Sequence, residues 1–164
     1  MAPYALAGQG AAQVVVSRYG DSSDPVSVPV ADVSPKVFPD SLMTCPGSSS
    51  GNEFIPGCVS NSPDNPAVPG RLLDFLITGA GVWDVPVQEG AIGLWDQPFK
   101  TLPVGVTVGG VPALIRYVGA VPYQPMGVLM VIAVVPRGVS GLQPLVVTVG
   151  DVSNVDQGVN VSVQ

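Results

Sequence analysis

The stretch of residues 103–118 is the sequence feature that most constrains the fold of this chain. Valine occupies alternate positions of residues 104–108, which gives the period of two of a strand with one buried face. Gly109 and Gly110 follow, and two residues that adopt positive φ without strain are what a two-residue hairpin turn requires. Residues 111–118 read as the second strand. Because a lone hairpin is only marginally stable in water, we expect the rest of the chain to pack on this one.

The composition favours strands throughout. The chain has 164 residues, of which 46% are hydrophobic and 11% charged, with 20 glycines and 18 prolines. Much of the apolar content is valine, whose branched Cβ suits strands, while glycine and proline at this density interrupt helices. We therefore predict an all-β protein with almost no helix.

Further strands are predicted over residues 72–78, 128–135, 146–149 and 159–163. About six strands with regularly spaced turns are typical of a two-sheet antiparallel β-sandwich. The run over residues 128–135 is apolar without interruption, which indicates either a strand covered on both faces or an interface with a partner.

The head of the chain repeats the pattern of its tail. Valines 14–16, the turn at Gly20-Asp21 and the alternating residues 26–30 have counterparts in residues 146–149, Gly150-Asp151 and residues 159–163. The head therefore looks like the last hairpin of the module that fills the tail. The alternative is that any two valine-rich hairpins look alike.

Several short motifs follow one another along the chain. They are residues 65–70 (NPAVPG), 78–81 (TGAG), 106–113 (VTVGGVPA), 117–119 (YVG), and 146–150 (VVTVG) with Ser153-Asn154. Together they resemble an uncharacterised Ig-like (IPT/TIG-like) family that occurs as C-terminal modules of large secreted bacterial proteins, notably acidobacterial ones. Residues 26–31, Ser34-Pro35 and Val37-Phe38 resemble the junction between two such modules. The resemblance thins over residues 42–62 and 85–100.

This resemblance implies an antiparallel Ig-like β-sandwich at residues 69–164. Residues 1–37 are expected to form a hairpin like the end of a second Ig-like module, and residues 38–68 an irregular linker. The family has no known catalytic residues, so we expect a protein that is not an enzyme. This chain departs from the pattern in the wholly apolar Val128-Leu129-Met130 and in its cysteine-bearing insert.

Cys45 and Cys58 are the only cysteines, and we expect them to form a disulfide. The alternative is two unpaired thiols. A zinc site is disfavoured because the chain has no histidine and two thiolates rarely suffice. The disulfide, the sparse lysine and the polar loops favour an extracellular or cell-surface location, within a larger exported precursor. The alternative is a cytosolic protein.

Charge and composition also exclude classes of function. The net charge of −6 and the scattered basic residues argue against nucleic acid as a partner. The absence of histidine disfavours Ser-His-Asp and Cys-His catalysis, and no apolar run is long enough to span a membrane.

No cofactor or metal is expected, although the oxygen-rich residues 151–156 leave calcium as an alternative. A carboxylate pair of Asp74 with Asp84 or Glu89 is a remote hydrolase alternative.

Aromatic residues gather in the loops around the central hairpin, where they could stack on sugar rings or cap the core. They are Trp83, Trp95, Phe99 and Tyr123.

The head hairpin is the feature that says most about function. Its apolar face and unpaired sheet edges would be exposed unless another strand or sheet covers them. We expect it to pair with a neighbouring subunit or Ig-like module, so that the chain assembles into a fibre or surface layer by strand addition. The expected assembly residues are Val14, Val15, Val16, Val26, Val28, Val30, Val128, Leu129 and Met130. Alternatives are that the hairpin folds back on its own sandwich, that an upstream segment completes it, or that the chain is an adhesion module binding protein or polysaccharide.

Overall fold

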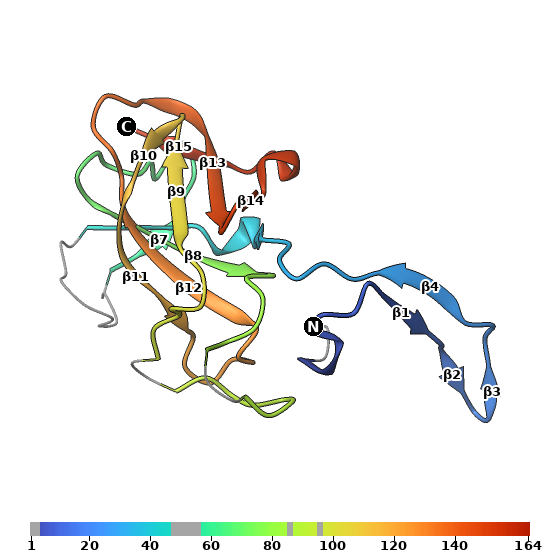
Figure 1. Cartoon of the computed structure of the whole chain (residues 1–164). Helices are drawn as coiled ribbons and strands as arrows, with labels where there is room; N and C mark the ends of the chain where they lie inside the picture. The colour runs from blue at the N-terminus through green and yellow to red at the C-terminus, as the bar shows by residue number, and fades with distance from the viewer. Residues whose placement is uncertain (1–3, 47–56, 85–86, 95–96) are drawn as a thin grey trace.

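The protein folds into a two-sheet antiparallel β-sandwich from which a long hairpin extends (Figure 1). The computed structural model describes residues 4–46, 57–84, 87–94 and 97–164. The all-β prediction is confirmed: besides strands, this part of the chain holds only three short 3₁₀ helices. None of its helices has the length and apolarity that crossing a membrane would demand.

One sheet of the sandwich has five strands. Its order is β10-β9-β13-β14, and β15 also pairs with β13. The strands are β9 (Val104–Val108), β10 (Val111–Pro112), β13 (Gly141–Val149), β14 (Val152–Ser153) and β15 (Asn160–Val163).

The other sheet has six strands. Its order is β11-β12-β8-β6-β7, and β5 also pairs with β8. The strands are β5 (Lys36–Val37), β6 (Met43–Cys45), β7 (Val59–Ser60), β8 (Leu72–Thr78), β11 (Leu114–Ala120) and β12 (Val128–Val134).

The predicted central hairpin is present, but its second strand is divided between the sheets. Gly109 and Gly110 have φ angles of 60° and 77° and connect β9 to β10, as the turn prediction requires. β10 pairs with β9 over only two residues, and after Ala113 the chain crosses to the other sheet as β11. The sequence alternates on both sides of this crossing, so its pattern does not reveal the change of sheet.

The core lies between the two sheets, where alternate residues of β9, β13 and β8 face one another. β12 is covered on both faces: Val131 lies in this core, whereas Ile132 joins a second apolar cluster beside the disulfide. β12 also has a neighbour on each edge, β11 and β8. The prediction that Val128, Leu129 and Met130 are assembly residues is therefore corrected, because they lie inside the sheet with no edge left for a further strand.

The expected irregular linker, residues 38–68, is more ordered than predicted. It contributes η2 (Pro39–Ser41) and the short strands β6 and β7. β6 pairs with β8 through Thr44↔Leu73, and so satisfies backbone groups along one edge of β8. Short strands without a hydrophobic alternation give no signal in the sequence. Residues 47–56 lie outside the described residues.

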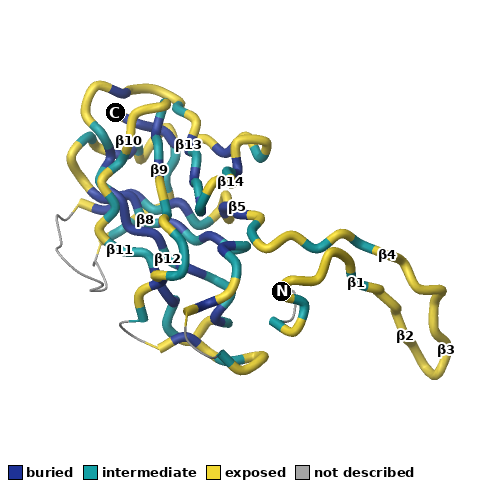
Figure 2. The backbone as a smooth tube through the Cα atoms, in the orientation of Figure 1, coloured by how far each residue is buried: buried dark blue, intermediate teal, exposed yellow. Residues whose placement is uncertain are grey.

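Residues 10–30, called the arm, form the hairpin that extends from the sandwich. Its strands are β1 (Ala11–Val14), β2 (Ser17–Arg18), β3 (Asp21–Ser22) and β4 (Val26–Pro29). Within the described ranges these strands pair only with one another. Figure 2 shows exposed residues along almost all of the arm, in contrast with the many buried residues in the strands of the sandwich.

Both ends of the arm are attached to the sandwich. On one side, η1 (Tyr4–Leu6) places Tyr4 against the core, and the Ala5 N–H donates to Glu89 Oε1 at 3.1 Å. On the other, the Ser34 N–H donates to the Gly79 carbonyl oxygen at 2.8 Å. Gly79 is required there because its φ is 74° and a Cβ would overlap the Ser34 carbonyl. Two attachment points give the arm a defined origin on the sandwich.

Candidate assembly surface

The arm is a regular antiparallel hairpin that an irregular step divides into two parts. Near the sandwich, the Val30 N–H donates to the Gly10 carbonyl at 3.1 Å, and Val14 pairs with Val26. At the step, Val16 and Ser23 exchange two bonds. The Ser23 N–H donates to the Val16 carbonyl at 2.9 Å, and the Val16 N–H donates to Ser23 Oγ at 3.1 Å.

The C-terminal hairpin of the sandwich, formed by β13, β14 and β15, has the same construction. Gly141 pairs with Val163, as Gly10 does with Val30. At the step, the Asn154 N–H donates to the Val147 carbonyl at 3.1 Å, and the Val147 N–H donates to Asn154 Oδ1 at 2.7 Å.

The two hairpins match pair by pair. Beyond the step, Ser17↔Ser22 corresponds to Thr148↔Ser153, and each hairpin then turns through two residues. Before the step, the partners that correspond are Ala11↔Pro29 with Leu142↔Ser162, Ala12↔Val28 with Gln143↔Val161, and Gln13↔Ser27 with Pro144↔Asn160. The repeat in the sequence is thus a repeat in hydrogen-bond register.

The hairpins differ in one insertion. The C-terminal hairpin has η3 (Val155–Gln157) and Gly158 where the arm has only Asp24 and Pro25. The insertion fastens that hairpin to the opposite sheet, since the Gln157 side chain accepts from the Val37 N–H at 2.8 Å and donates to the Val37 carbonyl at 2.6 Å. Beside it, Lys36 pairs with Asp156 at 2.9 Å and holds the pKa of that exposed carboxyl below its usual range.

The arm carries an apolar face that the described part of the chain leaves largely open: Val14, Val16 and Val26 are exposed, whereas Val28 and Val30 are half-buried. Side chains alternate between the two faces of a strand. Five of the six arm valines predicted to take part in assembly therefore share one face, and Val15 lies on the other. Val16 is 67% exposed, whereas its counterpart Val147 is 0% exposed. The valines on this face are Val14, Val16, Val26, Val28 and Val30.

The turn at the tip of the arm is Tyr19-Gly20. Both residues have positive φ, 51° and 93°, as a two-residue hairpin turn demands. The Arg18 guanidinium lies over the Tyr19 ring, 5.0 Å from its centre. The sequence predicts the turn at Gly20-Asp21, and the structure places it one residue earlier. Tyrosine rarely adopts positive φ, so the residue type gives no sign of this position.

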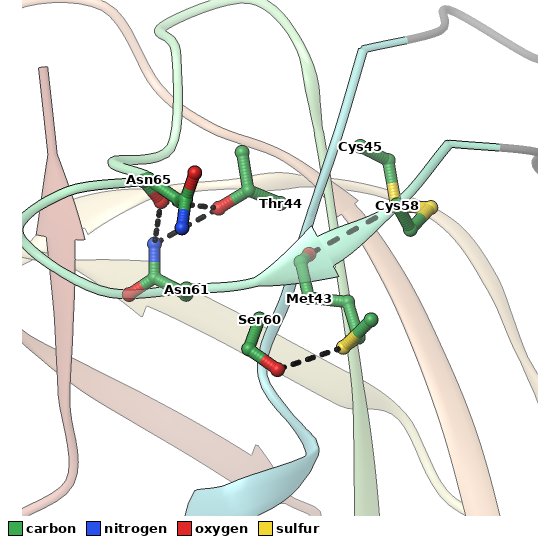
Figure 3. Close-up of a disulfide and its surroundings, with 7 residues drawn as sticks. All are labelled: Met43, Thr44, Cys45, Cys58, Ser60, Asn61 and Asn65. Carbon is green, nitrogen blue, oxygen red and sulfur yellow. Dashed lines mark hydrogen bonds between the residues drawn. A yellow bond between two sulfur atoms is a disulfide. The ribbon is translucent and has the colours of Figure 1, made fainter.

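The predicted disulfide is confirmed. Cys45 and Cys58 are joined at an S–S distance of 2.03 Å (Figure 3). It joins the end of β6 to the residue before β7 and lies against Leu72 and Ile132 on the outer face of the six-stranded sheet. Beside it, Asn61 Nδ2 donates to Thr44 Oγ1 at 3.0 Å. The disulfide therefore forms part of the packing of the sandwich.

Of the two roles considered for the loop aromatics, the structure favours packing in the core over binding a ligand for Trp83 and Phe99. Trp83 and Phe99 are 8% and 7% exposed and pack edge to face, 5.4 Å apart. Trp83 Nε1 donates to the Met126 carbonyl at 2.8 Å, so its polar group is also used. Tyr123 is 77% exposed, and Trp95 lies outside the described residues. Trp83 and Phe99 serve the core and cannot stack on a sugar.

The acidic residues considered for chemistry have structural surroundings. Asp74 lies on the central strand β8 between Met43 and Ile132, and burial raises its pKa to about 6. Glu89 accepts from the Ala5 N–H. No cluster of three or more potential metal-ligating His, Cys, Asp or Glu side chains occurs in the described ranges.

A shallow groove beside the edge strand β11 was not anticipated from the sequence. It runs between β11 and the segment that enters β9, and it is lined by Phe99, Val104 and Ile115 with the cations of Lys100 and Arg116. These residues belong to different sheets and connections, so no local pattern brings them together.

No family model, curated protein or solved structure matches this chain.

Proposed function

We propose that this chain is a non-catalytic structural or interaction protein that associates with other Ig-like modules through its arm. A second copy of the chain is the leading partner, and strand addition is the mode of association. The observation that carries the proposal is the matching register of the two hairpins combined with their opposite burial. A hairpin built like a core element, yet left uncovered, is a surface that gains free energy when another sheet covers it.

Attachment of the arm at both ends supports this function. A two-stranded ribbon alone is marginally stable in water, and order at the ends reduces the entropy lost when a partner binds. Its position away from the sandwich leaves the valine face accessible to another molecule. Folding back onto its own sandwich, the alternative from the sequence, is not the arrangement observed in Figure 1.

An extracellular setting is part of the proposal. Disulfides persist in oxidising compartments, and Cys45–Cys58 is such a bond. A fibre or surface layer of exported modules would use the same contact between each pair of neighbours. A head-to-tail contact repeats in this way without limit unless the rotation between neighbours closes the assembly into a ring. Polysaccharide binding is not proposed, because two of its four predicted aromatic residues are buried.

Light scattering over a range of concentrations, with negative-stain imaging, tests this function. The matched control replaces residues 11–29 with a short Gly-Ser linker, which the hydrogen-bonded Gly10 and Val30 leave close enough to join. This control keeps Tyr4 and its contact with the core. We expect the full chain to grow in mass with concentration and the control to remain monomeric. Equal masses for the two chains at every concentration would overturn the proposal.

A further inference from the structure

We infer that the partner strand adds to the β1–β2 edge of the arm, and that it is a strand of the β9 type, with valine at alternate positions. This inference rests on the proposed function and specifies which edge of the arm is used and what binds there. Three observations on the arm and its counterpart lead to it.

The two edges of the arm are not equivalent. The bond from Val30 to Gly10 fixes which residues face inward, because hydrogen-bonded and non-hydrogen-bonded pairs alternate along an antiparallel ladder. Ala11 and Gln13 therefore direct their backbone groups outward from β1, and Ser27 and Pro29 direct theirs outward from β4. In the described chain, no backbone hydrogen bond occupies these outward groups.

Proline makes the β4 edge a poor site for pairing with another strand. Pro29 has no N–H to offer a partner strand, and Pro25 lies just before β4 on the same strand of the hairpin. Residues 11–18, which hold β1 and β2, contain no proline, so every outward N–H on that edge can donate. Proline at a sheet edge is one of the ways in which proteins prevent pairing, so the pairing-competent edge is the one without it.

The C-terminal hairpin shows what binds at the corresponding edge. There, β9 pairs with β13 through Leu145↔Val108, Val147↔Val106 and Val149↔Val104. Leu145 and Val147 correspond to Val14 and Val16 of the arm. On β13, the residues that direct their backbone groups toward β9 alternate with Leu145 and Val147. On the arm, the residues in the equivalent positions are Gln13 and Val15. A strand like β9 would thus pair with residues 14–18 and place its valines on the same face as Val14 and Val16. In a folded copy β9 itself is paired with β13 and with β10, so the inference concerns a strand of this type and not β9 of the sandwich.

Paired proline variants distinguish the two edges. Ser17 and Ser22 are opposite each other in the ladder, and both direct their backbone groups outward. Ser17→Pro removes a donor from the β1–β2 edge, inside the stretch that the partner strand would cover, and Ser22→Pro removes one from the opposite edge. Both variants lose the bond between the two hydroxyl groups, so this loss cancels in the comparison. We expect Ser17→Pro to weaken the self-association constant at least tenfold and Ser22→Pro to leave it within twofold of the parent chain.

A peptide provides a readout that does not depend on self-assembly. A fluorescently labelled peptide of residues 101–110, which contains the β9 sequence, should bind the parent chain and the Ser22→Pro variant, as measured by fluorescence anisotropy. It should bind neither Ser17→Pro nor the chain in which a linker replaces residues 11–29. A circular dichroism spectrum and melting temperature matching those of the parent chain would confirm that each variant keeps its sandwich.

The outcomes separate this inference from the proposed function. Loss of association in both proline variants, in neither, or in Ser22→Pro alone overturns the choice of edge. If the chain with the linker still fails to assemble in those cases, the arm remains the assembly element and only the edge is wrong. If peptide binding follows the predicted order in a chain that does not self-associate, the edge is right and the partner is a different Ig-like module.

Discussion

The arm and the C-terminal hairpin are two copies of one local structure in opposite surroundings. Both have the same register, a turn of two residues and the same side-chain closure seven residues apart, Val16 with Ser23 and Val147 with Asn154. One is buried beneath a second sheet and paired with β9, and the other stands in solvent. The comparison teaches that local sequence determines the hairpin, whereas burial depends on what packs against it. Four sets of substitutions would sharpen or break this comparison.

The largest difference is expected from placing a charge on the equivalent valines. Val147→Asp would bury an unpaired carboxylate and should destabilise the fold by more than about 4 kcal/mol. Val16→Asp places the same charge in water and should change the melting temperature very little, while it lowers association through the arm. Thermal unfolding of the two variants side by side measures this. Similar losses of stability would show that the arm is packed against the sandwich in solution.

Removal of the disulfide should affect the sandwich alone. The Cys45→Ser/Cys58→Ser double variant opens a loop with a sequence separation of 13, which is expected to cost about 3 kcal/mol. Urea unfolding of this variant against the parent chain gives the difference. Association through the arm, measured at low urea, should be unchanged. A drop in association equal to that in the arm-less control would contradict the independence of the two regions.

Replacing Asp74 should stabilise the sandwich in a pH-dependent way. The folded-state pKa of about 6 lies above the ordinary value of 3.8, so the folded chain holds a proton that the unfolded chain releases between these values. The free energy of unfolding therefore falls as the pH rises through this window. Asp74→Asn should be more stable than the parent by up to about 3 kcal/mol at pH 7 and equal to it near pH 3. A constant difference across this range would contradict burial of the carboxyl group.

The smallest effect concerns the closure shared by the hairpins. Asn154→Ala leaves the buried Val147 N–H without its acceptor and should cost about 1–3 kcal/mol. Ser23→Ala, the equivalent change in the exposed arm, should cost less than about 0.5 kcal/mol, since water replaces the hydroxyl. Chemical unfolding of both variants tests the pair. An equal cost at the two positions would mean that Val16 is shielded from water.

Much of the architecture could be predicted from the sequence because it has local causes. Alternating valines and the Gly109-Gly110 turn identified β9 and the hairpin, and the cysteines identified the disulfide. The internal repeat was visible in the valines and turn residues. These features arise from side-chain period and backbone freedom, which are properties of neighbours in the chain.

The rest depended on contacts between distant residues. The crossing at Ala113 and the short strands β6 and β7 follow from which edges remain open after the longer strands pair. The burial of Trp83 against Phe99 could not be told from exposed loop aromatics by composition. The unpaired edge of the arm needed the register of Gly10 with Val30, which only the folded backbone provides.

Amide hydrogen exchange at the outward positions of the two hairpins, followed by NMR at several protein concentrations, tests the central claim most directly. Val146 and Thr148 of β13 should be protected at every concentration, because β9 covers that edge. Val15 and Ser17 of the arm should exchange freely in dilute solution and become protected as the concentration rises. If Val15 and Ser17 exchange freely at concentrations where the chain has assembled, the β1–β2 edge of the arm is not where the molecules join.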